Sequence, residues 1–158
     1  MEIRVAKIAD VQTIADLNVE VQNLHAAALP HMFKAVSDGA FAVAFITEQI
    51  KTPANYFLIA NVDGEDVGYV FARLVRRTGN EYMRPWSLVY IDQIAVKASH
   101  QRRGCGSALI QAVRDLADEF AIETIALDTW AFNEAAQAFF AKQGFTTYKM
   151  QMWAQVEA

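Results

Sequence analysis

The sequence predicts a single domain of the mixed α/β class, in which helices flank a central mixed β-sheet. Residues 88–129 contain an apolar strand, a short polar linker, an amphipathic helix and a second strand, which is the order of a βαβ-like unit. Two β-rich runs, 56–62 and 67–77, are joined by a turn sequence at 63–66 that favours an antiparallel hairpin. The strand at 88–96 is apolar on both of its faces, which is typical of a central strand covered on both sides.

Length, composition and charge narrow the class of protein. The 158 residues fit one domain spanning 1–158 with a single core. No run approaches the roughly 18 apolar residues that cross a bilayer, and the first residues do not resemble a signal peptide, so we expect no membrane association and a cytoplasmic location. The net charge of −4 argues against nonspecific nucleic-acid binding and favours a cationic partner such as an amine. One cysteine excludes an intrachain disulfide and a cysteine-based zinc site, and no histidine or carboxylate spacing suggests another metal site.

The first third of the chain is expected to form a strand and two helices. The strand is expected at 3–6, and Asp10 is expected to cap the first helix, which ends near Pro30. Apolar residues spaced three and four apart form the expected inward face of this helix: Ile14, Leu17, Val21, Leu24 and Ala28. A second helix is expected from about Asp38 to Lys51, where the following Thr-Pro pair stops it. Its expected inward residues are Phe41, Phe45, Ile46 and Ile50.

The remaining elements follow from similar patterns. An irregular connection at 78–86 leads into the central strand, and a later strand is expected at 124–129. Asn133 is the expected N-cap of a short helix that Gly144 ends. The alternation of polar and apolar residues at 145–153 predicts a closing strand. The predicted order is therefore βααβββαβαβ.

A glycine-containing loop after the central strand has the features of an anion-binding site. Gly104 and Gly106 open the amphipathic helix, whose first turn leaves backbone N–H groups without intrahelical acceptors. The absence of Cβ atoms at these positions would let a pyrophosphate reach those groups, and Arg102 and Arg103 would add full positive charges. Cys105, between the two glycines, is interpreted as a spacer.

Two motifs resemble the GNAT superfamily of N-acetyltransferases. The family's acetyl-CoA loop reads Gln or Arg-x-x-Gly-x-Gly or Ala, and this chain has Gln101, Gly104 and Gly106 at those positions. The family's second motif, Asn-x-x-Ala-x-x-Phe-Tyr-x-x-x-Gly-Phe, is similar to residues 133–145. The resemblance implies the GNAT acyl-CoA N-acyltransferase fold, which has the predicted element order. It also implies an enzyme that moves an acetyl group from acetyl-CoA to a primary amine by direct attack in a ternary complex.

The resemblance also implies which residues hold acetyl-CoA. In the family the central strand and the next strand splay apart, and the backbone of the central strand pairs with the pantetheine arm; here that backbone belongs to Ile94, Ala95 and Val96. The loop from Arg102 to Ser107 would hold the pyrophosphate. The second motif would leave room for the cofactor and shield it from water. The implied cofactor-binding residues are Ile94, Ala95, Val96, Gln101, Arg102, Arg103, Gly104, Cys105, Gly106, Ser107, Asn133, Ala136, Phe139 and Phe140.

The expected catalytic groups match the family's pattern less closely than the expected cofactor-binding residues do. The tyrosine that commonly protonates the departing thiolate in the family corresponds to Phe140, which has no proton to donate. Water, Tyr148 or Tyr90 are the substitutes, and Tyr148 is the first candidate. Asp92 is the candidate base that accepts a proton from the amine, because a carboxylate among apolar groups on the central strand would be a better base; a structural role for it stays open.

The resemblance implies further roles around the acceptor. The N–H group of Ile94 or its neighbour would face the oxyanion of the tetrahedral intermediate. His25 and His31 lie where the family often builds its acceptor pocket, although a histidine in such a connection is usually only solvated. The expected partner is a small-molecule or peptide amine acceptor, and which amine it is cannot be read from the sequence. Dimers are common in the family, so a homodimer is one oligomeric state that the resemblance implies.

Two other interpretations of the sequence stay open at this point. A dinucleotide-binding fold would also have a Gly-x-Gly helix start, with Asp128 near the place of a ribose-binding acid. However, its third glycine position is Leu109, and the loop does not directly follow the strand. A noncatalytic acyl-CoA-binding sensor with the same fold is the second alternative, and Phe140 motivates it.

Overall fold

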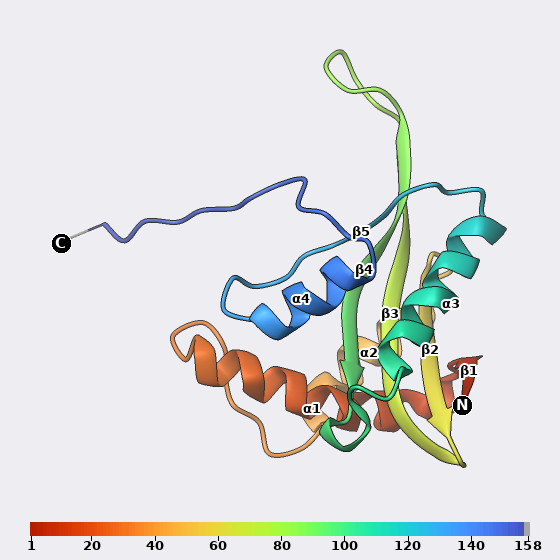
Figure 1. Ribbon diagram of the computed structural model, residues 1–158, viewed down its shortest axis with the longest axis vertical. Helices are drawn as coiled ribbons and strands as arrows, with labels where there is room; N and C mark the ends of the chain where they lie inside the picture. The colour runs from red at the N-terminus through yellow and green to blue at the C-terminus, as the bar shows by residue number, and fades with distance from the viewer. Residues whose placement is uncertain (157–158) are drawn as a thin grey trace. The chain divides into compact units, whose positions relative to one another are not determined.

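A computed structural model describes residues 1–156 of the chain (Figure 1). Two compact units make up the chain, Met1–Asp128 and the residues from Thr129 onward. The first unit contains one mixed sheet with helices, and the second contains one helix. Its elements are, in order, β1 (Glu2–Val5), α1 (Val11–Ala28), α2 (Ala40–Gln49), β2 (Asn55–Val62), β3 (Glu65–Arg77), β4 (Trp86–Val96), α3 (Cys105–Glu119), β5 (Ile125–Leu127) and α4 (Glu134–Lys142). Short 3₁₀ turns at Ile8–Asp10 and Ala98–His100 precede α1 and α3.

The sheet has the strand order β1-β2-β3-β4-β5. The first four strands are antiparallel neighbours, and β5 lies parallel to β4. The hairpin between β2 and β3 has its turn at Asp63 and Gly64, which both adopt positive φ angles, as the two central residues of a type I′ turn do. The predicted mixed α/β class is therefore confirmed. The strand β4 lies between β3 and β5 as predicted, but it is paired with β5 over only part of its length.

Helices cover both faces of this sheet in the first unit. One face carries α1 and α2 over a core that includes Ile14 and Ile46 from the helices and Phe57, Tyr69 and Phe71 from the strands. The rings of Phe57 and Phe71 stack with centroids 4.2 Å apart. The other face carries α3, which contacts β2, β3 and β4 (Figure 1). This arrangement follows from the alternation of side chains along each strand, because both faces of β2 and β3 are apolar.

The predicted inward faces of α1 and α2 are partly wrong. Leu24 and Ala28 are exposed, because the buried position at this end of α1 is Ala26, two residues and therefore about 200° around the helix axis from Leu24. In α2, Phe41 and Phe45 are each 45% exposed. Ile46 is buried as predicted, and the other buried position is Ala42, one residue after Phe41 and therefore about 100° further around the helix axis.

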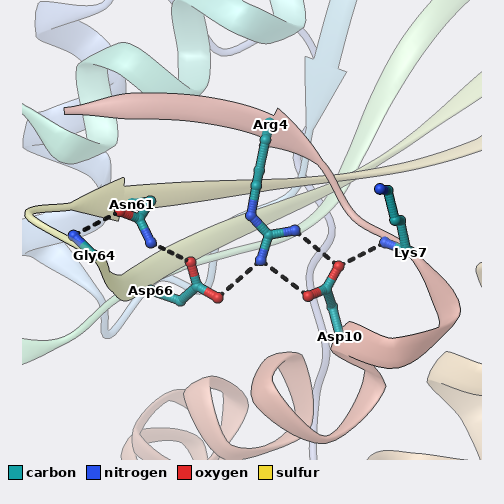
Figure 2. A network of polar contacts seen from close by, with 6 residues as sticks. All are labelled: Arg4, Lys7, Asp10, Asn61, Gly64 and Asp66. Atoms are coloured by element: carbon teal, nitrogen blue, oxygen red, sulfur yellow. Dashed lines mark hydrogen bonds and ion pairs between the residues drawn. The ribbon is translucent and has the colours of Figure 1, made fainter.

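Asp10 lies at the predicted start of α1, but its carboxylate does not cap the helix. It instead accepts two hydrogen bonds from the guanidinium of Arg4, at 2.8 and 2.9 Å, and one from the backbone N–H of Lys7 at 2.7 Å. Arg4 also donates to Asp66 on β3 at 2.9 Å (Figure 2). The network connects β1, the turn before α1 and the β2–β3 hairpin. The hydrogen bonds from Arg4 hold the pKa of Asp10 below its usual value.

The closing strand predicted at 145–153 is wrong. Residues 145–156 form no helix or strand, and the side chains of Tyr148, Met150 and Met152 are 75 to 87% exposed. Alternation of apolar and polar residues predicts which side chains share a face, but a strand also requires a partner for its backbone hydrogen bonds. The order of elements therefore agrees with the predicted one up to α4. The prediction of one domain across 1–158 stays a prediction.

We predict that Asp10→Asn destabilises the fold in a pH-dependent way. Because the folded-state pKa of Asp10 is lowered, its ionised form stabilises the fold above the ordinary carboxyl pKa of about 4. That contribution is lost as the pH falls through the folded-state value. Urea denaturation should show the variant about 1 kcal/mol less stable than the wild type at pH 7, with the difference shrinking below pH of about 4. An equal difference at pH 7 and pH 3 would contradict this account.

Candidate functional site

The strand β4 separates from β5 halfway along its length. The two strands pair in parallel at Val89, Tyr90 and Ile91, and the last pair joins Ile91 to Leu127. Beyond Ile91, β4 continues to Val96 and stays paired with β3 on its other side. The opening begins at a β-bulge, since Phe71 pairs with Gln93 and the next residue, Ala72, pairs with Ile91. The pairing of β4 with β5 therefore ends partway along β4, as the predicted splay requires, and the splay itself stays a prediction.

The register shows which backbone groups face the opening. In an antiparallel pair, alternate residues bond to the partner strand and the others point away from it. The N–H of Lys97 donates to the carbonyl of Val67 at 2.8 Å, so the residues two and four positions earlier also face β3. Ile94 and Val96 then direct their N–H and carbonyl groups toward the side that β5 has left. The side chain of Gln101 donates to the carbonyl of Val96 at 3.1 Å, as this orientation requires.

Hydrogen bonds anchor the turn between β4 and α3. Gln101, the first residue of the loop motif, reaches back to β4 through Val96. Glu20 on α1 accepts from the N–H of Ala98 at 3.1 Å, and Lys97 pairs with Glu65 at 2.7 Å. The turn that precedes α3 is thus held to both α1 and β3.

The first turn of α3 lies directly after this anchored turn. Gly104 is its N-cap, with φ +88°, and a Cβ at this position would meet nothing within 4 Å. The first intrahelical hydrogen bond runs from Ala108 N–H to Gly104 O, so the N–H groups before it point out of the helix end. Cys105 is 2% exposed and its thiol lies in the core, which agrees with its interpretation as a spacer. Arg102 and Arg103 are exposed at the same end.

A buried hydrogen-bond network connects α1, β3 and the bulged part of β4. The hydroxyl of Tyr69 donates to Gln93 Oε1 at 2.8 Å and accepts from Asn18 Nδ2 at 2.5 Å. Tyr69 has no exposed surface, and its burial raises the pKa of the phenol well above its usual value. The network therefore holds the Gln93 side chain through the Tyr69 hydroxyl and through Asn18, whose Nδ2 donates to Gln93 Oε1 at 3.1 Å.

The predicted surroundings of Asp92 are wrong. Its carboxylate does not lie among apolar groups, because the extra residue of the bulge turns it toward the exposed guanidinium of Arg73 on β3. Arg73 Nη2 donates to Asp92 Oδ1 at 2.9 Å, and Arg73 Nε donates to the other oxygen. This bond raises the pKa of Arg73, so the guanidinium stays charged. Both carboxylate oxygens of the predicted base are thus engaged in an ion pair.

A second carboxylate, that of Asp128, lies at the start of the opening, and the sequence analysis did not count it among the catalytic candidates. The hydroxyl of Tyr90 donates to Oδ2 of Asp128 at 2.6 Å, and Asp128 directly follows β5. The ring of Tyr90 also lies under the guanidinium of Arg73, with 5.5 Å between the guanidinium carbon and the ring centroid. The only sequence signal was the position of Asp128 at the end of an apolar strand, which the dinucleotide interpretation had used.

The second motif forms the helix that the sequence predicts. The side chain of Asn133 caps α4 by accepting from the N–H of Ala136 at 3.1 Å, and Gly144, at φ +86°, follows the helix. Ala136, Phe139 and Phe140 are its more covered residues and share one face. The Phe140 ring is buried between Phe139 and Phe145, with centroids 5.2 and 5.7 Å away. The roles of these residues in cofactor binding stay predictions.

The positions of three other predicted candidates follow from their own segments. His25 Nδ1 lies 2.7 Å from the carbonyl of Val21 in its own helix, and its ring contacts Phe33. His31 is exposed in the connection between α1 and α2. Tyr148 is exposed in the segment that lacks secondary structure. Within residues 1–156, no group of three or more histidine, cysteine or acidic side chains could hold a metal ion.

A pocket of about 210 Å³ lies between α1, the start of β3 and the residue that follows β4. Its lining residues are Thr13, Asp16, Leu17, Glu20, Asp66 and Lys97. Asp66 and Lys97 are already paired with Arg4 and Glu65, and Glu20 holds the backbone of Ala98. None of the predicted site residues contributes to it, so we interpret it as a gap between α1 and the sheet. No helix within the described residues is long and apolar enough to cross a membrane.

Comparison with known proteins identifies a family. Residues 19–145 match the acetyltransferase (GNAT) family. An N-alpha-acetyltransferase of Sulfurisphaera tokodaii is 30% identical over 152 residues, which cover 94% of this chain and 81% of the relative. An uncharacterized N-acetyltransferase of Lactobacillus delbrueckii subsp. lactis is 33% identical over 100 residues, 63% of this chain. The match covers only 57% of that relative's length.

Solved structures share the fold. A tetramutant of the BH1408 protein from Bacillus halodurans superposes with a TM-score of 0.93 at 22% identity, over 99% of this chain and 100% of that one. The aminoglycoside N-acetyltransferase AAC(6')-Iy in complex with CoA gives a TM-score of 0.75 at 19% identity, over 99% of this chain and 95% of that one. At these identities the likeness shows the fold alone.

We predict that Tyr69→Phe costs about 1 kcal/mol of unfolding free energy, because it removes the two hydrogen bonds of the hydroxyl while Asn18 Nδ2 still donates to Gln93 Oε1 at 3.1 Å. Urea denaturation measures this loss. Tyr56→Phe on β2 is the matched control, since the Tyr56 ring packs on Phe120, and it should stay within about 0.5 kcal/mol of the wild type. Equal stability of Tyr69→Phe and the wild type would show that the network does not stabilise the bulge.

Proposed function

This chain belongs to the acetyltransferase (GNAT) family, and on that premise we propose that it is an N-acetyltransferase. The proposed reaction moves an acetyl group from acetyl-CoA to a primary amine by direct attack in a ternary complex. One observation carries the proposal: none of the described strands pairs with the free side of β4 at Ile94 and Val96, directly before the turn that leads into α3. In the proposal, the edge of β4 binds the pantetheine arm that carries the thioester of acetyl-CoA. The first turn of α3 binds the diphosphate at the other end of that arm.

The open edge of β4 supports binding of the pantetheine arm. That arm carries two amide groups in an extended chain, and an extended chain with amides can pair with a strand edge as another strand would. The N–H and carbonyl groups of Ile94 and Val96 point toward the opening, as the register requires. Gln101 occupies one carbonyl there and thereby fixes where the pairing ends.

The first turn of α3 supports binding of the pyrophosphate. Its outward N–H groups and the helix dipole favour a doubly charged anion. The open space at Gly104 lets the diphosphate approach the backbone, and the exposed guanidinium groups of Arg102 and Arg103 lie at the same end. These positions are proposed as the phosphate-binding residues.

The same geometry supports the acyl-transfer chemistry. Bound acetyl-CoA supplies an activated acetyl group with a thiolate as the leaving group. The N–H of Ile94 is proposed to donate to the oxygen that becomes negative in the tetrahedral intermediate. A thiol with a pKa near 8.5 leaves tolerably as a thiolate at neutral pH, so the buried Phe140 does not exclude turnover. The role of Asp92 as the base stays a prediction. Its ion pair with Arg73 occupies both carboxylate oxygens, so it must open before Asp92 can accept a proton.

A noncatalytic acyl-CoA sensor is the second candidate function, because Phe140 replaces the usual tyrosine and Tyr148 is exposed in a segment without secondary structure. Thiol release from acetyl-CoA in the presence of a panel of primary amines separates the two functions. We expect amine-dependent release with at least one amine, including an amino-terminal peptide. Tight acetyl-CoA binding without release on any amine would favour the sensor.

We predict that Gly104→Val weakens CoA binding at least tenfold, because the added methyl groups occupy the space that the diphosphate needs. Isothermal titration calorimetry with CoA measures the effect. Gly64→Val is the matched control, since Gly64 has nearly the same φ, +89°, and the same open surroundings but lies in the β2–β3 hairpin.

Both valine variants should lose similar stability, of the order of 1–3 kcal/mol, from the left-handed backbone conformation. Only Gly104→Val should lose affinity for CoA. An unchanged affinity in Gly104→Val, or an equal loss in Gly64→Val, would contradict the proposed phosphate site.

A further inference from the structure

Two aspartates flank the point at which β4 and β5 separate. The last residues paired between the parallel strands are Ile91 and Leu127. Asp92 is the next residue on β4, and Asp128 is the next residue after β5. The opening therefore begins between two carboxylates, one from each strand, and this place follows from the pairing alone.

Four side chains form a continuous chain across the start of the opening. Asp92 is paired with Arg73, Arg73 lies over the ring of Tyr90, and the Tyr90 hydroxyl donates to Asp128. Arg73 and Tyr90 are cross-strand partners, so all four side chains lie on one face of the sheet. The group contains two carboxylates and one guanidinium, which leaves one negative charge for a cation to neutralise.

The two carboxylates differ in how they are held. Both oxygens of Asp92 accept from Arg73, so a ligand reaches them only when the ion pair opens. Asp128 is exposed, and one of its oxygens accepts from Tyr90, which fixes the direction of the carboxylate. Asp128 therefore combines a fixed orientation with exposure to solvent at the start of the opening.

We propose that Asp128 is the residue that takes the proton from the attacking amine and that Tyr90 positions it for this step. The proposal rests on the proposed acetyltransferase function and adds the proton acceptor to it. It transfers the role predicted for Asp92 to the aspartate on the other side of the opening.

The location of the reacting carbonyl supports this assignment. If the N–H of Ile94 faces the carbonyl oxygen, the acetyl carbon lies about two residues along β4 from the start of the opening, roughly 7 Å at 3.3 Å per residue. The amine nitrogen must approach that carbon to about 3 Å. It then lies between Ile94 and the start of the opening, which Asp92 and Asp128 flank.

The proposed step is balanced without another reactant. The neutral amine forms a nitrogen–carbon bond with the acetyl carbonyl, whose π electrons move to the oxygen. As this bond forms, the nitrogen becomes acidic, and one of its protons passes to the carboxylate of Asp128. The carbonyl re-forms, the carbon–sulfur bond breaks, and the CoA thiolate leaves with the bonding electrons. Asp128 is exposed, so its proton passes to water, which protonates the thiolate.

We expect Asp128→Asn to lower kcat about 100-fold for any amine that the wild type acetylates, the usual size of a general-base contribution. The KM for acetyl-CoA should stay within about twofold, because Asp128 is not among the groups proposed to hold CoA. Steady-state thiol release measures both constants. Glu123→Gln is the matched control: it removes one exposed carboxylate just before β5, and it should leave kcat unchanged.

Tyr90→Phe tests the positioning role, because it keeps the ring under Arg73 and removes the hydroxyl. We expect kcat to fall about tenfold with an unchanged KM for acetyl-CoA, the loss of one hydrogen bond to a charged group. Asp128→Glu should recover part of the activity that Asp128→Asn loses. A purely structural role for Asp128 would give no such recovery, because a longer side chain would disturb the site as much as Asn does. Calorimetry with CoA serves as the check that each variant is folded.

The outcomes separate the inference from the proposed function. Wild-type turnover with Asp128→Asn within threefold of it would overturn the inference and leave the acetyltransferase function intact. The same holds if Asp92→Asn loses 100-fold and Asp128→Asn does not, because the base would then be Asp92. A wild type that binds acetyl-CoA and acetylates no amine would overturn the proposed function, and the inference with it.

Discussion

The structure depends on the partial pairing of β4. Its one edge is bonded to β3 along most of its length, while β5 covers the other edge only as far as Ile91. Backbone N–H and carbonyl groups beyond that point need partners, and an extended ligand with amide groups can provide them. The bulge at the start of the opening, the network of Tyr69 below it and the anchored turn after Val96 all serve to keep this edge in place.

The charged groups are arranged around the same opening. Positive charge lies at its far end, where Arg102 and Arg103 flank the first turn of α3. Negative charge predominates at its near end, where the guanidinium of Arg73 pairs with Asp92 and the hydroxyl of Tyr90 donates to Asp128. An anionic cofactor and a cationic amine would thus enter at opposite ends and meet near Ile94. The composition gives only the net charge of −4, whereas the structure shows where charges of each sign lie around the opening.

Much of the fold could be predicted from the sequence, because periodicity and turn residues act locally. The hairpin at 63–66, the helix after Gly104 and the cap at Asn133 are local features of this kind. The prediction of a closing strand was wrong because a strand needs a neighbouring strand to pair with, and alternation of polar and apolar residues does not specify one. The prediction for the surroundings of Asp92 was wrong because one bulged residue redirects its side chain. The hydrogen bond from Tyr90 to Asp128 could not be predicted from local patterns, because it joins residues 38 positions apart.

Amide hydrogen exchange of individual residues, measured by NMR with and without CoA, tests the central claim most directly. If the open edge of β4 binds the pantetheine arm, CoA should slow exchange at Ile94 and Val96 and at the first turn of α3. The amides of Gln93 and Ala95, which face β3, should change little and serve as an internal reference. Tight CoA binding without added protection at Ile94 and Val96 would contradict the account.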